Sequence, residues 1–320
     1  MRQQYLDIAK GVGIIAVIIG HAVPHGSFAF NVIFSFHMPL FFVVSGMLFK
    51  TLDFSSLIRK KFKSLVVPYI VTCFLVMICW MTRHYAKEGQ IDIISYLISF
   101  IWGAGFNMSS PSGIEPIGAI WFLLAMFGAQ LLYNVPLPKY IPRIVYCAIL
   151  VVCGMVLGRL FWLPLDLCVA MVAVAYLYLG EKIRELGCIG NMGWGGVTLL
   201  LFLWSIGWFK TLGMVSNSYP YYGFSLFSSF AGSLFFLNIS KHLEILFCNS
   251  PLCKYLSYMG QYSLVILCFH VIELLFPWHR LSNSIAVRIM IEVILLSLVP
   301  IVVAHIPYLS NVYKLKNLKK

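Results

Sequence analysis

Long apolar segments recur along the chain, separated by short polar stretches that hold most of the charged residues. A helix crosses a bilayer with roughly 20 mostly apolar residues, and it satisfies its own backbone polar groups in hydrocarbon. The pattern therefore predicts an all-α, polytopic integral membrane protein with about ten transmembrane helices. The predicted spans are 7–24, 28–49, 65–82, 117–134, 141–159, 161–179, 195–212, 221–239, 257–276 and 285–306.

An eleventh apolar stretch, 93–105, is shorter and contains glycine, which favours an interfacial or re-entrant helix. The positive charges decide against counting it as a span. With ten spans and both termini cytoplasmic, 17 of the 23 lysines and arginines lie on the inner side and 6 on the outer side. An eleventh span would leave 11 inside and 12 outside. Because cytoplasmic loops carry an excess of positive charge, ten spans are favoured.

Residues 1–320 are expected to form a single membrane domain, because no soluble region and no internal repeat is visible. The largest segment outside the membrane is then 83–116, an outer loop in which 93–105 is the candidate interfacial helix. The start of the chain imitates a signal peptide. However, a second apolar segment follows after Pro24–Ser27, which favours a retained membrane anchor.

The composition agrees with this interpretation, since 61% of the residues are hydrophobic and 11% are charged. A soluble domain typically carries about 25% charge, so a soluble protein is excluded. The net charge of +12 comes from short basic clusters between apolar segments, which is typical of membrane orientation rather than nucleic-acid binding. The nine cysteines form no CxxC pair, so we expect neither a disulfide framework nor a metal site.

Ionisable side chains inside spans usually face an interior cavity and mark function, and four stand out: His21, His37, Asp166 and His270. In the first span, Lys10 and His21 are 11 residues apart. At about 100° per residue they share one helix face, with His21 roughly 16 Å further along the axis. This stripe predicts the wall of a pocket entered from the cytoplasm. The alternative for each histidine is a hydrogen bond that holds two helices together.

Two further features point to the same inner region. Pro39 follows His37 closely and predicts a bend in the second span, which suits a cavity. A basic loop follows this span and contains Arg59, Lys60, Lys61 and Lys63. Such a loop is a topology signal, and it would also attract a polyanion such as a nucleotide or the diphosphate of coenzyme A.

The first two spans carry a pattern that resembles the start of the membrane acyltransferase-3 family, and its fucose-4-O-acetylase-like branch in particular. The pattern consists of Asp7-x-x-Lys10-Gly11, Gly20-His21, Phe36-His37-Met38-Pro39-Leu40-Phe41-Phe42 and Ser45-Gly46. The resemblance continues through Arg59 to Tyr69, Trp121-Phe122-Leu123, Leu163-Pro164-Leu165-Asp166, Gly180, and Gly260-Gln261-Tyr262-Ser263 leading to His270.

The resemblance implies a ten-helix, multi-pass enzyme of the inner cell membrane. Such an enzyme takes an acyl group, usually acetyl, from cytoplasmic acyl-CoA. It transfers this group to a hydroxyl of a surface polysaccharide or of its lipid-linked precursor. It also implies that His21 holds the position of the family's essential histidine. Lys10 stands where the family often has an arginine. The positive charge is therefore kept, but the planar guanidinium that can donate two parallel hydrogen bonds is lost.

The chemistry then suggests roles for the candidate residues. His21 would act as the general base toward a sugar hydroxyl, or would itself accept the acyl group transiently. His37 and Asp166 would orient His21 or stabilise the developing oxyanion. Lys10, Arg59, Lys60 and Lys63 would hold the phosphates of acetyl-CoA. No metal is expected.

Two other functions fit a polytopic protein with an internal cavity. A glycan flippase or small-molecule transporter would carry broken helices in both halves, which the sequence does not reveal. A glycan polymerase would carry a larger outer loop with charged sites, and 82–116 contains such residues. Release of free thiol from acetyl-CoA would separate the acyltransferase from both.

Overall fold

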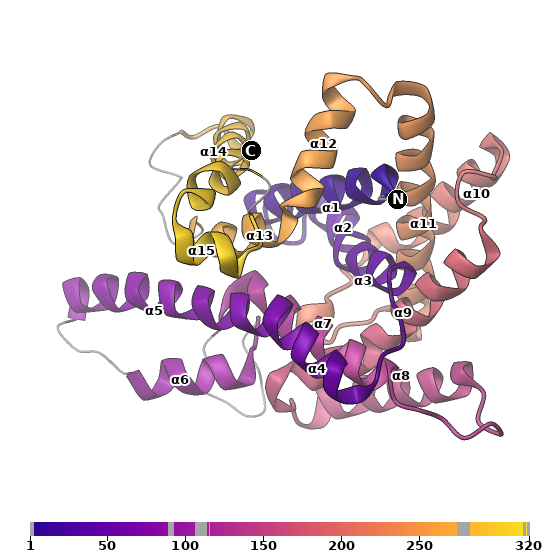
Figure 1. The fold of residues 1–320 in the computed structure, drawn as a ribbon, viewed down its shortest axis with the longest axis horizontal. Coiled ribbons are helices and arrows are strands. Elements are labelled where there is room, and N and C mark those ends of the chain that lie inside the picture. Colours follow the sequence, from indigo (N-terminus) through magenta and orange to yellow (C-terminus); the bar gives the residue numbers. More distant parts are fainter. Residues whose placement is uncertain are drawn as a thin grey trace.

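The computed structural model describes residues 3–88, 93–105, 114, 116–273, 282–315 and 318. Within them the regular elements are helices, and one isolated bridge joins Gly213 to Ser218 (Figure 1). The predicted all-α fold is confirmed. The helices are α1 Gln4–Ala22, α2 Phe28–Phe34, α3 His37–Met47, α4 Phe54–Lys61, α5 Val67–Glu88, α6 Ile93–Trp102, α7 Trp121–Tyr133, α8 Arg143–Leu160, α9 Leu167–Leu186, α10 Trp194–Ser205, α11 Phe224–Phe247, α12 Pro251–Gln261, α13 Ser263–Glu273, α14 Ile285–Ala304 and α15 Pro307–Val312.

Each predicted span coincides with one of these helices or with a pair of them. In the described residues, six helical stretches are long and apolar enough to cross a membrane, or seven if one bent pair counts as a span. Three apolar helical stretches are shorter, and they include α6, the candidate interfacial helix. The protein is thus a multi-pass membrane protein. The count of ten and the cytoplasmic termini stay predictions, and 89–92, 106–113 and 115 of the predicted outer loop lie outside the described residues.

The bend predicted at Pro39 lies three residues earlier. The second predicted span divides into α2 and α3 at Ser35 and Phe36. Pro39 is the third residue of α3, within the first helical turn, where a missing N–H costs no intrahelical hydrogen bond. His37 is consequently the first residue of α3, directly after the break.

The predicted basic loop is helical, which corrects the sequence interpretation. Helix α4 continues through a π-helical turn (η1, Phe62–Val66) into α5, so that Phe54–Thr82 is helical throughout. The start of α4 is capped by Asp53, whose Oδ2 accepts a hydrogen bond of 2.8 Å from the backbone N–H of Ser56. This hydrogen bond also lowers the pKa of the exposed Asp53 carboxyl.

The predicted span 257–276 is not a single straight helix in the described residues. Helix α12 starts earlier, at Pro251, and the chain breaks at Tyr262 with an angle of 71° between α12 and α13. Helix α12 packs closely against α1 just before this break. A Cβ added at Gly260 would collide with the carbonyl oxygen of Asp7 on α1, and one at Gly11 with the carbonyl oxygen of Leu256. Small residues of this kind let membrane helices approach closely.

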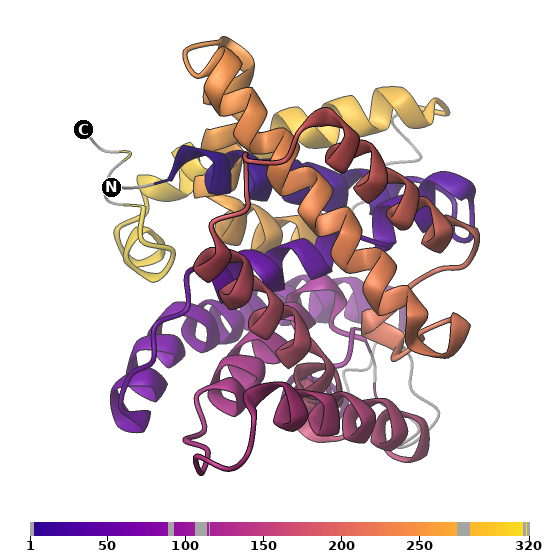
Figure 2. The ribbon, with the colours of Figure 1, turned by 90° about the vertical axis from the view of Figure 1, so that its right-hand side faces the viewer.

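Helices α1, α3 and α9 form the centre of the fold. Helix α1 packs against α12, α11 and α3, and α9 packs against α3, α7 and α8. Glycines again set the closest approach, because Gly46 faces the carbonyl of Leu177 and Gly180 faces the carbonyl of Val43. Figure 2 shows α11 as the long orange helix that crosses the molecule, and α10 packs beside it. This packing brings the polar residues of α1 and α3 into the interior.

Candidate active site

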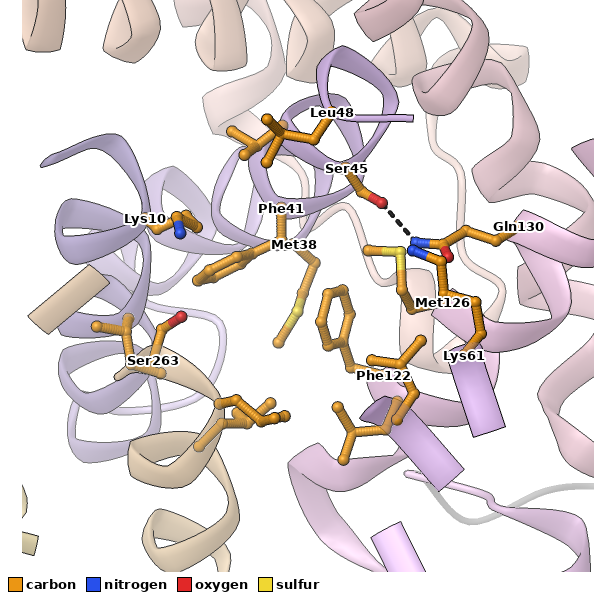
Figure 3. Close-up of a pocket in the computed structure, with 16 residues that line it drawn as sticks. Lys10, Met38, Phe41, Ser45, Leu48, Lys61, Phe122, Met126, Gln130 and Ser263 are labelled. Atoms are coloured by element: carbon orange, nitrogen blue, oxygen red, sulfur yellow. Dashed lines mark hydrogen bonds between the residues drawn. The ribbon is translucent and has the colours of Figure 1, made fainter. Parts of the chain in front are cut away.

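Three adjacent cavities follow α1 along its length. The Lys50 cavity, named for the exposed lysine on its wall, has a volume of about 610 Å³ and includes Arg184 of α9. The Phe122 cavity has a volume of about 270 Å³ (Figure 3). The His21 cavity is the smallest, at about 60 Å³.

Shared side chains join these cavities into one series. Lys10 and Leu48 line both the Lys50 cavity and the Phe122 cavity. Met38 lines both the Phe122 cavity and the His21 cavity. Ile14, which lies between Lys10 and His21 on the predicted stripe, also lines the Phe122 cavity. The stripe of α1 thus borders all three spaces.

His21 contacts two other aromatic side chains. It lies near the end of α1 and is exposed to the space of its cavity. Its ring centroid lies 5.3 Å from that of His270 on α13, with the rings tilted by 54°. Phe34 presents an edge at 6.0 Å on another side. His270 is fully buried, whereas His21 is exposed and is the member of the pair that lines the cavity.

His37 lines the same cavity in a fixed orientation. Its Nδ1 lies 2.7 Å from the carbonyl oxygen of Ile33, at the end of α2. A carbonyl only accepts, so Nδ1 carries the proton, and in a neutral ring the lone pair is on Nε2. Phe34 stands edge-on to His37 at 4.8 Å and thus contacts both histidines. The break before α3 therefore brings a second imidazole to the His21 cavity.

Lys10 lies at the junction of the two larger cavities. Its Nζ forms an ion pair of 2.7 Å with Oδ1 of Asp7, one turn earlier on α1. The lysine side chain is 22% exposed and that of Asp7 is 5% exposed, so the pair is largely enclosed by protein. Lys50 and Arg184 add positive charge to the Lys50 cavity, although Arg184 also pairs with Glu181 at 3.0 Å.

The Phe122 cavity has mostly apolar walls with a few polar groups (Figure 3). Met38, Phe41, Phe122 and Met126 contribute much of the apolar surface. The polar side chains that line it are Lys10, Ser45, Lys61, Gln130 and Ser263. An apolar space with a few oriented polar groups is typical of a site for an organic ligand.

The other predicted phosphate ligands lie outside these cavities. Arg59, Lys60 and Lys63 are exposed on α4 and η1, and none of them lines the cavities described above. Lys61, in contrast, lines the Phe122 cavity. The helix explains the difference, because Lys61 follows the buried Leu57 by one turn and shares its face. The role of the three exposed residues stays a prediction.

Asp166 also lies apart from the histidines. It is fully buried at the end of the short helix η3 (Pro164–Asp166), before α9, in a left-handed backbone conformation with φ of 56°. Its Oδ1 accepts a hydrogen bond of 3.1 Å from Nε1 of Trp162. None of the three cavities has Asp166 on its wall. Its predicted catalytic role is therefore not supported by a shared cavity, and it stays a prediction.

Comparison with known proteins now identifies the class of protein. Residues 3–310 match the sequence profile of the family described as "Acyltransferase domain". The chain belongs to this acyltransferase family. Together with its apolar helices, this membership makes the protein a membrane acyltransferase.

One curated relative matches part of the chain. Nodulation protein NolL of Mesorhizobium japonicum (strain LMG 29417 / CECT 9101 / MAFF 303099) is 29% identical over 144 residues. The match covers 42% of this chain and 36% of the relative, so this chain spans about a third of the relative's length. No solved structure matches this chain.

Proposed function

We propose that this membrane acyltransferase moves an acetyl group from cytoplasmic acetyl-CoA to a hydroxyl of a surface glycan or its lipid-linked precursor, in the inner cell membrane. The observation that carries the proposal is the series of cavities from the charged Lys50 cavity to His21. The resemblance to the fucose-4-O-acetylase-like branch supports a sugar hydroxyl as the acceptor.

The dimensions of the passage suit a long, polar-headed donor. Lys10 and His21 are separated by 11 residues of helix, which corresponds to roughly 16 Å along the axis. A donor with phosphates at Lys10 and Lys50 would extend its apolar arm through the Phe122 cavity toward His21. The exposed Arg59, Lys60 and Lys63 would raise the local concentration of such a polyanion through long-range attraction.

His21 is proposed as the general base. A sugar hydroxyl is a poor nucleophile until a base accepts its proton, and an imidazole suits this role near neutral pH. As the hydroxyl oxygen forms its bond to the acyl carbon, the C–S bond breaks. The proton taken by His21 then passes to the departing thiolate, which leaves as CoA-SH. The alternative within the same function is a transient acyl group on His21 itself.

The two other histidines are proposed to assist. His270 contacts the ring of His21 and would hold it in the orientation that presents a basic nitrogen to the cavity. His37, whose Nδ1 is bonded to Ile33, would place its Nε2 toward the reacting groups. If His37 is protonated at both nitrogens, that Nε2–H becomes a donor for the oxyanion.

Transport is the second candidate, because one of its expected features is present. Interrupted helices occur in both halves of the chain, at Ser35–Phe36 and at Tyr262. The sequence pattern predicted a bend in the second span, at Pro39, and none at Tyr262. Family membership favours the acyltransferase. Both functions would use the same passage, so a chemical assay has to separate them.

The test is thiol release from acetyl-CoA. The purified full-length protein in lipid nanodiscs is supplied with acetyl-CoA and with membranes from the source strain lacking the gene, which provide the acceptor. The proposal predicts free CoA thiol together with acetyl groups in the glycan fraction, both lost in His21→Ala and retained in His25→Ala. In a parallel assay the protein is placed in proteoliposomes, which enclose a compartment; uptake of a glycan or of acetyl-CoA there without thiol release would instead support transport.

A further inference from the structure

One polar side chain in the Phe122 cavity has a hydrogen-bonding atom that is not used within the protein. Gln130 of α7 is 3% exposed, and its Nε2 donates a hydrogen bond of 2.7 Å to Oγ of Ser45 (Figure 3). Its Oε1 is buried and has no hydrogen-bond partner. A buried, unsatisfied amide oxygen costs about 1–3 kcal/mol, so its presence on a cavity wall points to a ligand.

The position of Gln130 narrows the chemistry of that ligand. The side chain lines the same cavity as Lys10, which also borders the Lys50 cavity, and Met38, which also borders the His21 cavity; Figure 3 shows it across the cavity from Lys10. The surrounding walls are apolar, with Phe122 and Met126 near Gln130 in sequence on the same helix. A ligand segment that fits here is an extended aliphatic chain interrupted by a group that can hydrogen-bond to an amide.

We infer that the Phe122 cavity binds the pantetheine arm of the acyl donor and that the side-chain amide of Gln130 pairs with an amide of that arm. This inference rests on the proposed function and names the part of the donor that the middle cavity recognises. The arm is aliphatic apart from its amides, which matches the walls. Ser45 holds Gln130 in place through its own hydrogen bond, which fixes the direction of the remaining amide edge.

The inference holds for either orientation of the Gln130 amide. If Oε1 faces the ligand, it accepts from an amide N–H of the arm. If the amide is turned by 180°, Ser45 donates to Oε1 and Nε2 donates to an amide C=O of the arm. In both cases the cavity selects a secondary amide over a plain alkyl chain of similar length, because an alkyl chain would leave the glutamine unsatisfied.

The test compares donors with and without an amide next to the thioester. Purified full-length protein in nanodiscs is assayed for thiol release with acetyl-CoA, S-acetyl-N-acetylcysteamine and S-ethyl thioacetate, using the same acceptor membranes. The variant Gln130→Met keeps the length of the side chain and removes its hydrogen bonds. The same change at Gln261, an exposed residue bonded to Ser257 at the end of α12, serves as the matched control.

The expected result is a rise in KM for acetyl-CoA of between about twofold and tenfold in Gln130→Met, with kcat unchanged. Of the two donors that contain an amide, acetyl-CoA and S-acetyl-N-acetylcysteamine, at least one shows this rise in KM. S-ethyl thioacetate shows no rise, and Gln261→Met behaves as the wild type. An unchanged KM for acetyl-CoA in Gln130→Met, or an equal effect on all three donors, overturns the inference while leaving the proposed function intact. Absence of thiol release from the wild type with every donor overturns the proposed function, and this inference with it.

Discussion

Replacement of glycine by alanine should change stability in opposite directions at two positions. Gly11 lies in the contact between α1 and α12, whereas Gly195 lies in α10. A Cβ added at Gly11 would lie within 3.0 Å of backbone atoms of Leu256, where ordinary contacts are 3.4–4 Å. The Cβ would lie 2.0 Å from the carbonyl oxygen of Leu256, and real contacts of a Cβ are essentially never under 3.0 Å. Backbone cannot rotate away as a side chain can, so Gly11→Ala must move the two helices apart by about 1 Å. A Cβ at Gly195 of α10 would meet nothing within 4 Å. The same substitution is therefore free of collision at Gly195.

The magnitudes follow from these two situations. Overpacking a close contact costs about 1–3 kcal/mol, while replacing glycine by alanine in a helix gains up to about 1 kcal/mol. Gly11→Ala should therefore lower stability, and Gly195→Ala should leave it unchanged or raise it slightly. Because α12 leads into α13, the displacement at Gly11 should also shift His270 relative to His21 and lower the rate of acyl transfer.

A native cysteine reports on this contact directly. Cys253 of α12 is fully buried in a cluster with Ile8 of α1 and Leu256. The rate at which maleimide labels Cys253, measured by mass spectrometry of its peptide under native conditions, should rise in Gly11→Ala and not in Gly195→Ala. Equal labelling rates and equal thermal midpoints for the two variants would refute the reasoning.

Three further substitutions test individual residues of the site. Lys10→Ala should raise the KM for acetyl-CoA while Lys10→Arg keeps it near the wild-type value, and an unchanged KM in Lys10→Ala would exclude a phosphate contact. His270→Phe should lower kcat by about 10- to 100-fold at constant KM, because it removes the ring nitrogens that could orient His21, and His270→Asn, which keeps a polar group, should be less affected. Full kcat in His270→Phe would exclude this role. Asp166→Leu should lower the yield of folded protein, because it removes the acceptor of the Trp162 hydrogen bond, and should leave kcat per folded molecule unchanged, because Asp166 lines none of the three cavities. A loss of kcat with normal folding would support its predicted catalytic role.

Much of the fold was predictable because membrane helices depend on local composition. Apolar length alone predicts the helices, and the 3.6-residue period places Lys10 and His21 on one face of α1 without knowledge of their neighbours. The break at Tyr262 was not predictable in this way, and neither was the close contact of Gly260 with α1. Hydropathy does not register such contacts between helices.

The site was predictable in part for the same reason. His21 and His37 were found because an imidazole in a span is conspicuous, and both line the smallest cavity. The contact between His21 and His270 joins two distant segments and has no sequence signal. Gln130 was missed although it is a polar residue in an apolar span. Lys61 was named only as part of the basic loop, although it shares a helix face with the buried Leu57. The shared face of Leu57 and Lys61 becomes apparent only if Asp53 is recognised as the cap of a helix, because these two residues face the same side only in a helix.

The central claim is that His21 carries out acyl transfer to a surface glycan. The most direct measurement is NMR of the surface glycan from cells that express His21→Ala, with His25→Ala as the control. His25 is an exposed histidine beyond the end of α1. We expect the O-acetyl signals to vanish in His21→Ala and to remain in His25→Ala at equal membrane abundance. Undiminished O-acetyl signals in His21→Ala at normal abundance would contradict the account.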